Sequence, residues 1–210
     1  MRLRNVAGAK EKIEDCVYTV INPNEHIGNW NKVFGNNNPI HIEIGMGKGQ
    51  FITNHAKRDT NINFIGIEKF DSVLVRAVEK LDDTNLDNLK LIRMDAENIE
   101  EVFKEELDTV YLNFSDPWPK NRHEFRRLTS REFLTRYNAI FKNVKTIIQK
   151  TDNRKLFEFS LQSFIENGYK IEEISLDLYN DEYPNNIPTE YEEKFKNKGQ
   201  CIYMVKVSKL

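Results

Sequence analysis

The chain has 210 residues, of which 39% are hydrophobic and 30% charged, and its formal net charge is −2. This length suits one domain with a hydrophobic core, and the composition excludes a fibrous or disordered chain. The longest unbroken apolar run, Cys201 to Val205, has five residues, which is far too short for a membrane-spanning helix.

Short β-branched runs alternate along the chain with longer runs whose apolar residues recur at helical spacing. In chain order, we expect strands at residues 39–45, 63–68, 89–95, 109–114, 144–150, 169–178 and 201–208. Between them we expect helices at residues 51–59, 71–82, 99–106, 129–141 and 153–167. The pattern Thr129-x-x-Glu132 is typical of a capping box that opens a helix, and Gly168 is typical of a helix end.

This alternation predicts an α/β domain with a mostly parallel seven-stranded sheet and helices on both faces. The connection between the last two strands leaves little room for a crossover helix, so we expect an antiparallel last strand. We assign residues 1–210 to one domain, in which residues 1–38 extend a core of residues 39–210. Open sheets of this kind bind ligands beyond the carboxyl ends of their strands, so those ends carry the functional prediction.

The first strand ends in the loop Glu43-Ile44-Gly45-Met46-Gly47-Lys48-Gly49. Glycines at such a turn bring backbone N–H groups close to a ligand. The spacing is G-x-G-x-G, whereas a dinucleotide site prefers G-x-G-x-x-G. A carboxylate at Glu43 would repel a pyrophosphate but suits the cationic S-adenosylmethionine. We therefore expect S-adenosylmethionine as the cofactor, bound by Glu43, Gly45 and Gly47.

The next two predicted strands also end in acidic residues. Glu68 ends the second strand, where a carboxylate can accept hydrogen bonds from ribose hydroxyls. Asp95 and Ala96 end the third strand, where the carboxylate can accept from an adenine amino group and a backbone N–H can serve a ring nitrogen. Each acid could also be a helix N-cap. Three successive strands that each end in an acid favour the cofactor site.

The fourth strand leads into Ser115-Asp116-Pro117-Trp118-Pro119-Lys120, where two prolines stiffen the backbone and would hold Asp116 beside the methyl group. Residues 120–136 then carry six basic and two acidic side chains, a local charge of +4. We interpret this basic stripe as a surface for a polyanionic substrate, although a solvated helix face would give the same pattern. The phosphates would meet Lys120, Arg122, Arg126 and Arg127.

Three motifs follow in order: Tyr111 to His123, Lys150 to Arg154, and Thr189 to Phe195. Through them, residues 39–207 resemble the bacterial tRNA (guanine-N7-)-methyltransferase family, known as TrmB. The resemblance implies a Rossmann-like class I S-adenosylmethionine-dependent methyltransferase fold. It also implies methyl transfer to N7 of a guanosine in the tRNA variable loop, at tRNA position 46, which gives 7-methylguanosine.

The resemblance also implies roles for individual residues. The cofactor site would include Glu43, Glu68, Asp95 and Asp116, with Asp116 also catalytic. The substrate guanosine would contact Lys120, Asp152, Thr189, Glu190, Tyr191 and Glu192. The tRNA would contact Arg122, His123, Arg126 and Arg127. Thr189-x-x-Glu192 also matches a capping box and Asp152 could be an N-cap, so the sequence leaves the division between capping and binding open.

One departure from the family pattern lies at the amino terminus. Family members usually carry Lys-Pro-Trp after the first arginines, whereas Arg2 and Arg4 here precede Asn5 to Gly8. The role of this arm in gripping tRNA therefore stays open.

Three alternative functions are a methyltransferase for another substrate, a nicotinamide-dependent oxidoreductase and an inactive RNA-binding module. The loop spacing and Glu43 oppose the oxidoreductase, and the intact strand-end motifs oppose the inactive module.

The four histidines lack metal-ligand spacing, so we expect no metal. Cys16 and Cys201 form no CxxC pair, and the amino terminus lacks the apolar block of a secretory signal. We expect a cytoplasmic protein, monomeric or homodimeric, that binds tRNA and no membrane.

Overall fold

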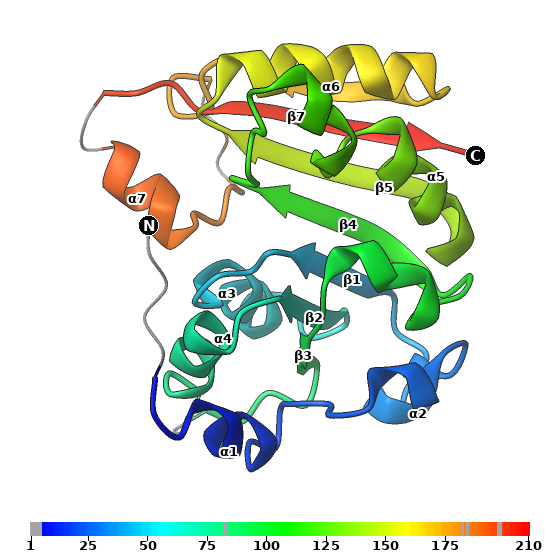
Figure 1. Cartoon of the computed structure of the whole chain (residues 1–210), viewed down its shortest axis with the longest axis vertical. Coiled ribbons are helices and arrows are strands. Elements are labelled where there is room, and N and C mark those ends of the chain that lie inside the picture. The colour runs from blue at the N-terminus through cyan, green and yellow to red at the C-terminus, as the bar shows by residue number, and fades with distance from the viewer. Residues whose placement is uncertain (1–5, 82–83, 182, 184, 197–198) are drawn as a thin grey trace.

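The computed structural model describes residues 6–81, 84–181, 183, 185–196 and 199–210 (Figure 1). Within these residues, a seven-stranded sheet has the order β3-β2-β1-β4-β5-β7-β6. Its strands are β1 Ile40–Ile44, β2 Asn63–Glu68, β3 Leu89–Arg93, β4 Leu107–Asn113, β5 Phe141–Thr151, β6 Lys170–Ser175 and β7 Tyr203–Lys209. Strands β1 to β5 are parallel, and β7 pairs antiparallel with β5 and β6. The predicted mostly parallel sheet with an antiparallel last strand is confirmed.

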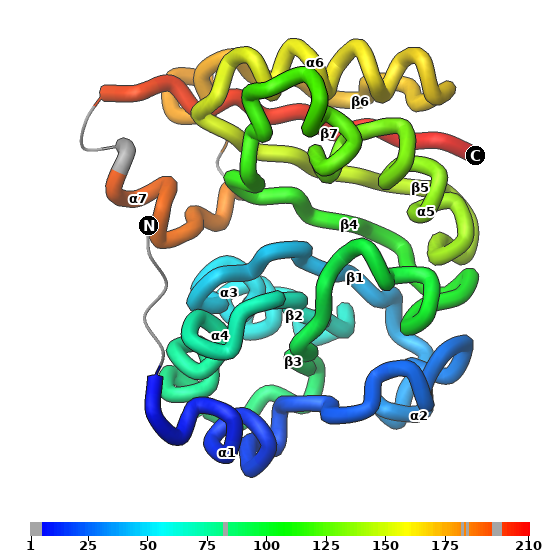
Figure 2. The backbone as a smooth tube through the Cα atoms, in the orientation of Figure 1, coloured from blue at the N-terminus to red at the C-terminus, as the bar shows by residue number. Residues whose placement is uncertain are grey.

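Helices cover both faces of the sheet, as the backbone tube in Figure 2 shows. The α-helices are α1 Ala9–Glu14, α2 Trp30–Phe34, α3 Gln50–Arg58, α4 Asp71–Val78, α5 Arg131–Ile140, α6 Arg154–Glu166 and α7 Glu190–Lys196. The 3-10 helices are η1 Pro23–His26, η2 Ala96–Glu101 and η3 Asn121–Arg126. One hydrophobic core joins α2, η2, α5 and α6 to one face, and a second joins α1, α3 and α4 to the other.

Two predicted helix starts are wrong. Ser130 caps α5, and its Oγ accepts from the Phe133 N–H at 3.4 Å. Thr129 is instead buried, with its hydroxyl 2.7 Å from that of Ser160, because this part of the chain faces α6. The helix predicted at residues 99–106 is the shorter η2, which Asp95 opens earlier by accepting from the Glu97 N–H at 3.2 Å.

The segment before β1 is built into the domain. Helix α1 packs on α4. The Leu91 N–H donates to the Tyr18 carbonyl at 2.8 Å, and the Val20 N–H donates to the Leu91 carbonyl at 3.0 Å, so residues 18–20 cover the open edge of β3. The sequence patterns predicted neither α1 nor α2. Arg2 and Arg4, which the sequence singled out, lie outside the described residues.

Gln149 gives a stability prediction. Its side chain in β5 is fully buried, and neither its Oε1 nor its Nε2 has a hydrogen-bond partner in the described part of the chain. A buried polar group without a partner costs roughly 1–3 kcal/mol. We therefore expect Gln149→Met, a change of similar volume, to raise the free energy of unfolding by about 1 kcal/mol or more in urea titrations.

Gln162→Met is the matched control, because Gln162 is exposed on α6 and bonds only its neighbour Glu166, at 2.7 Å. We expect the control to change stability by less than about 0.5 kcal/mol. A loss of stability in Gln149→Met would show that the buried amide is satisfied in solution and would contradict the prediction.

Candidate active site

The glycine loop after β1 has a backbone that only glycine adopts easily. Gly45, Gly47 and Gly49 have φ angles of 74°, 59° and 76°, in the left-handed region. The N–H groups of Gly45 and Met46 donate to the Ile67 carbonyl at 2.9 and 3.0 Å. These bonds fix the start of the loop on β2, so that the glycine turn stands at the carboxyl edge of the sheet.

Glu68 joins this loop to the end of β2. Its side chain is 7% exposed, and its Oε2 accepts from the Gly47 N–H at 3.2 Å. Its Oε1 accepts from the N–H groups of Lys69 and Phe70 at 2.8 and 3.0 Å. Burial raises the pKa of Glu68. A carboxylate accepts about four hydrogen bonds, so Glu68 still has room for a ligand hydroxyl.

Asp95 has the capping role that the sequence left open, whereas Glu68 does not. Asp95 accepts from the Glu97 N–H as the N-cap of η2, and its other oxygen pairs with the ammonium of Lys69. The N-cap position of α4 is Phe70, two residues after Glu68.

The predicted cofactor residues stand at neighbouring strand ends. Strands β3, β2, β1 and β4 are adjacent in the sheet. At their carboxyl ends, or in the turns that follow, lie Glu43, Gly45, Gly47, Glu68, Asp95, Ala96 and Asp116. The fold therefore gathers at one sheet edge residues that are up to 73 positions apart in the sequence.

Glu43 is a buried acid with unused bonding capacity. It is 2% exposed, and its Oε1 accepts from Asn113 Nδ2 at 2.9 Å. Its Oε2 makes no hydrogen bond within the described residues. Burial raises the pKa of Glu43 to about 7, against the opposing effects of the Asn113 hydrogen bond and the Lys150 charge. Near neutral pH the carboxyl group is therefore poised to ionise fully beside a cation.

The loop after β4 combines backbone strain with a free carboxylate. Phe114 and Trp118 have φ angles of 50° and 40°, which are costly for residues with side chains. Asp116 between them is exposed and makes no hydrogen bond or ion pair with any described residue. Strain that surrounds a free acid at a ligand-binding edge is typical of functional loops.

Asp152 lies at the end of β5 and is not a helix cap. The cap of α6 is Asn153, whose Oδ1 accepts from the Leu156 N–H at 2.9 Å. Asp152 instead accepts from the Tyr191 hydroxyl at 3.3 Å. The ring of Tyr191 lies 4.8 Å from that of Phe114. These contacts place Asp152 and an aromatic pair beside the loop that carries Asp116.

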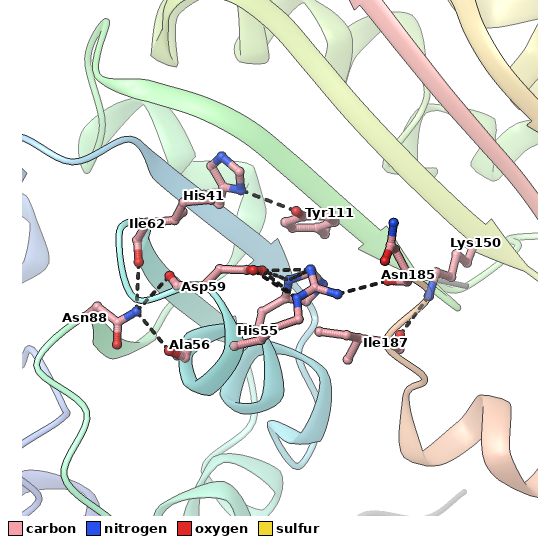
Figure 3. Close-up of polar contacts among 11 residues, drawn as sticks. His41, His55, Ala56, Asp59, Ile62, Asn88, Tyr111, Lys150, Asn185 and Ile187 are labelled. Carbon is pink, nitrogen blue, oxygen red and sulfur yellow. Dashed lines mark hydrogen bonds and ion pairs between the residues drawn. The ribbon is translucent and has the colours of Figure 1, made fainter. Parts of the chain in front are cut away.

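Thr189 and Glu192 form a reciprocal capping box at the start of α7. The Glu192 N–H donates to Thr189 Oγ1 at 3.0 Å, and the Thr189 N–H donates to Glu192 Oε2 at 3.3 Å. Both residues are buried, and Lys150 Nζ lies 3.2 Å from the Glu192 carboxylate. Lys150 also donates to the Ile187 carbonyl at 2.9 Å (Figure 3). The capping interpretation of this motif is confirmed, and Lys150 anchors it to β5.

The chain before α7 has a second anchor on α3. Arg58 donates to the Asn185 carbonyl at 3.0 Å, and its guanidinium lies 2.7 Å from the Asp59 carboxylate (Figure 3). His55 bonds the same carboxylate at 3.2 Å. Burial lowers the pKa of His55 to about 4, so the ring is neutral at pH 7. This cluster fixes the chain that leads to α7.

Glu190 links α7 to the glycine loop. Its carboxylate lies 3.5 Å from Lys48 Nζ, and it also pairs with Lys80 after α4. Both lysines are about half exposed, at 48% and 47%. The predicted cofactor loop and the predicted substrate motif are therefore in direct contact.

The basic stripe divides into outward and inward cations. Lys120, Arg122 and Arg126 are exposed, as predicted for a phosphate-binding face. His123 is half-buried, with its ring 5.8 Å from that of Trp118. Arg127 is only 9% exposed and binds carbonyl groups of the Asp116 loop, so little of it is left to meet a phosphate. Of the four residues expected to face tRNA, which are Arg122, His123, Arg126 and Arg127, the structure therefore does not support Arg127.

Sequence reasoning missed Asn113 and Lys150 as site residues. Both are polar and lie at the carboxyl end of a strand, Asn113 as the last residue of β4 and Lys150 as the last but one of β5. A polar side chain at the carboxyl end of a buried strand was the available signal. Their partners Glu43 and Glu192 are 70 and 42 positions away, and only the fold pairs them.

Comparison with known proteins gives one family. A family model described as "Putative methyltransferase" matches residues 37–205. A tRNA (guanine-N(7)-)-methyltransferase of Lachnoclostridium phytofermentans is 53% identical over 205 residues, which cover 97% of this chain and 96% of the relative. A protein of the same name from Bacillus subtilis (strain 168) is 51% identical over 209 residues, which cover 99% and 98%.

Solved structures agree on the fold. A structure described as an antibiotic related methyltransferase has a TM-score of 0.66 at 20% identity and covers 87% of this chain and 92% of its own. A SAM-dependent methyltransferase from Aquifex aeolicus has a TM-score of 0.57 at 13% identity and covers 98% and 100%. The predicted Rossmann-like methyltransferase fold is confirmed.

Proposed function

Because the chain belongs to the tRNA (guanine-N(7)-)-methyltransferase family, we propose that its target is the guanosine at position 46 of the tRNA variable loop. The enzyme transfers a methyl group from S-adenosylmethionine to N7 of guanosine in tRNA. The observation that carries the assignment of the site is the row of acids at adjacent strand ends, bordered by exposed cations.

The residues present fit S-adenosylmethionine. The buried Glu43 has an oxygen without a hydrogen-bond partner in the described chain, and the turn of left-handed glycines begins two residues after it. A cation there satisfies a carboxylate that is otherwise costly to bury. We assign the cofactor to Glu43, Gly45, Gly47, Glu68, Asp95, Ala96 and Asp116. When bound, S-adenosylmethionine supplies an electrophilic methyl group on a sulfonium.

The protein's task is to orient the acceptor. N7 of guanine carries an in-plane lone pair and no proton, so no general base is needed to create the nucleophile. Alignment of the reacting atoms accounts for up to about 7–11 kcal/mol in model systems. We assign Asp116 to the guanine or to the positive charge that develops on its ring, since its carboxylate is free on a stiff loop. Asp152 and Tyr191 would then border the base.

The substrate residues divide between contact and support. Lys120, Glu190 and Tyr191 lie at or near the surface and are our candidates for direct contact, together with Asp152. Thr189 and Glu192 shape α7 through their capping box. Lys120, Arg122, His123 and Arg126 form the proposed tRNA face, where phosphate contacts give affinity and register but no base identity.

We further propose that residues 1–210 act as one domain in the cytoplasm, as a monomer or homodimer, without a metal. Both cysteines are free thiols, which suits a reducing compartment. None of the helices in the described ranges could cross a membrane. In the same ranges, no cluster of three His, Cys, Asp or Glu residues could hold a metal ion.

The test of the proposed function uses labelled S-adenosylmethionine and unmodified tRNA transcript, followed by nucleoside analysis. We expect label in 7-methylguanosine, and its loss when the variable-loop guanosine at position 46 is replaced by adenosine. Label that persists in the altered transcript would contradict the assigned position. Label in another nucleoside would contradict the reaction itself.

A further inference from the structure

Arg127 is the most deeply buried cation of the basic stripe. Its side chain is 10% exposed, whereas Arg122 and Arg126 are exposed. Its Nε donates to the Pro117 carbonyl at 3.1 Å, and its Nη2 donates to the Trp118 carbonyl at 3.1 Å. Both acceptors directly follow Asp116 in the chain.

The loop needs such an outside support. Pro117 and Pro119 have no N–H group, so at these positions the backbone offers only carbonyl oxygens as fixing points. Trp118 between them has a φ of 40°, which a non-glycine residue keeps only when its surroundings enforce it. The hydrogen bonds from Arg127 to the Pro117 and Trp118 carbonyls therefore fix the backbone of this segment.

The guanidinium of Arg127 has two further contacts, with Phe159 and with Glu124. Its guanidinium carbon lies 4.2 Å from the ring centre of Phe159, on α6. Glu124 lies 3.7 Å from the guanidinium and balances its charge. A planar guanidinium can bond two carbonyls and stack on a ring at the same time, which the ammonium of lysine cannot do. Helix α6 thus supports the loop through Arg127.

Arg126, the preceding residue, has the opposite arrangement. It is exposed, and its guanidinium carbon lies 4.9 Å from the ring centre of Trp118 and 5.6 Å from that of Phe125. Adjacent arginines therefore contact different groups of the same loop, Arg126 the Trp118 ring and Arg127 the backbone carbonyls. One remains open to solvent, and the other is enclosed.

We propose that Arg127 is a positioning residue that holds Asp116 in its reactive place, and that it is not a phosphate ligand of the tRNA. The inference rests on the proposed function, because it assigns Arg127 a part in that same reaction. It separates residues that charge alone would group together.

The test compares Arg127→Lys and Arg127→Met with Arg122→Met, using steady-state methylation of tRNA at several salt concentrations. We expect both Arg127 variants to lower kcat about 10- to 100-fold, because a displacement of the Asp116 carboxylate by about 1 Å would lower the rate by about that factor. The KM for tRNA and its salt dependence should not change. Arg122→Met should instead raise the KM for tRNA and reduce the slope of log affinity against log salt by about 1.

Lysine at position 127 is the informative variant. It keeps the charge but loses the planar fork, so a positioning role predicts that it does not restore kcat. Recovery of kcat in Arg127→Lys, or a higher KM with a flatter salt slope, would overturn the inference. Absence of 7-methylguanosine from the wild-type reaction would instead refute the proposed function.

A further variant tests the inference in case the two Arg127 variants do not fold. Phe159→Leu removes the ring behind the guanidinium at a half-buried position and leaves Arg127 in place. We expect it to lower kcat about 3- to 10-fold with an unchanged KM for tRNA, since only one of the supports is lost. If the Arg127 variants fail to fold and Phe159→Leu has the wild-type kcat, the inference is wrong.

Discussion

Replacement of Asp116 by alanine is expected to lower kcat for tRNA methylation by about 100- to 1000-fold, the usual effect of removing one group that stabilises charge in a transition state. The carboxylate makes no hydrogen bond or ion pair with the described part of the protein. The native fold therefore loses little when it is removed, and the midpoint of thermal unfolding should shift by no more than a degree or two. The full effect should appear in catalysis.

Asp116→Asn sharpens this test, because asparagine keeps the size of the side chain and one acceptor oxygen but loses the charge. We expect Asp116→Asn to be nearly as inactive as Asp116→Ala if the charge stabilises the developing cation. Ser115→Ala, at the preceding half-buried position of the same loop, is the matched control and should remain active. Near-normal turnover in Asp116→Ala with intact tRNA would remove Asp116 from the mechanism.

The affinity for S-adenosylmethionine is expected to depend on pH through Glu43. Burial raises the pKa of this carboxyl group to about 7 before a ligand binds. The groups around it act in both directions, since Asn113 and Lys150 lower this pKa and Glu68 raises it. Cofactor binding favours the ionised form and so releases a proton. The apparent Kd should therefore be about tenfold weaker at pH 6 than at pH 8.

The same shift predicts how the stability of the ligand-free protein depends on pH. The folded-state pKa of Glu43 lies above its ordinary value of 4.5. Between these two values the folded protein holds a proton that the unfolded chain has lost. The contribution of Glu43 to stability is therefore fully present below pH 4.5 and is lost as the pH rises through 7. It amounts to roughly 3 kcal/mol at most.

Glu43→Gln is the variant that tests both predictions. Isothermal titration calorimetry at pH 6, 7 and 8, in buffers of different ionisation enthalpy, would count the protons released on binding. We expect Glu43→Gln to bind S-adenosylmethionine about 10- to 100-fold more weakly at pH 8, with no proton release and little pH dependence. A wild-type pH profile that persists in Glu43→Gln would assign the titration to another group.

The sequence predicted the features that neighbouring residues determine and missed those that depend on contacts between residues far apart in the chain. The short β-branched run at residues 63–68 predicted β2 correctly, because the strand is buried along its whole length. The start of α5 was misplaced by one residue because Thr129 and Ser130 are both good caps, and only the contact with Ser160 on α6 decides between them. Local pattern cannot carry that information.

The candidate site shows the same limit. The acids Glu43, Glu68 and Asp95 could be found because each lies at or just after the carboxyl end of a recognisable strand. Arg127 could not be separated from Arg126, since the two share charge, type and neighbourhood in the sequence. The side chain of Arg127, which follows η3, packs on Phe159, 32 positions later, whereas that of Arg126 packs on Trp118 and Phe125. The sequence also listed Asp152 as a possible cap, where the structure uses its neighbour Asn153.

The contact between Glu190 and the lysines Lys48 and Lys80 has a thermodynamic consequence. If S-adenosylmethionine changes the glycine loop when it binds, it also changes this contact and with it the affinity for tRNA at α7. Linkage then requires bound tRNA to change the affinity for S-adenosylmethionine by the same factor. Exposed ion pairs are worth less than about 1 kcal/mol, so this coupling should be no more than about fivefold. The buried pair of Lys150 and Glu192 fixes the same first turn of α7 on β5. S-adenosylmethionine and tRNA should therefore bind in either order, and each should change the affinity for the other by no more than about fivefold.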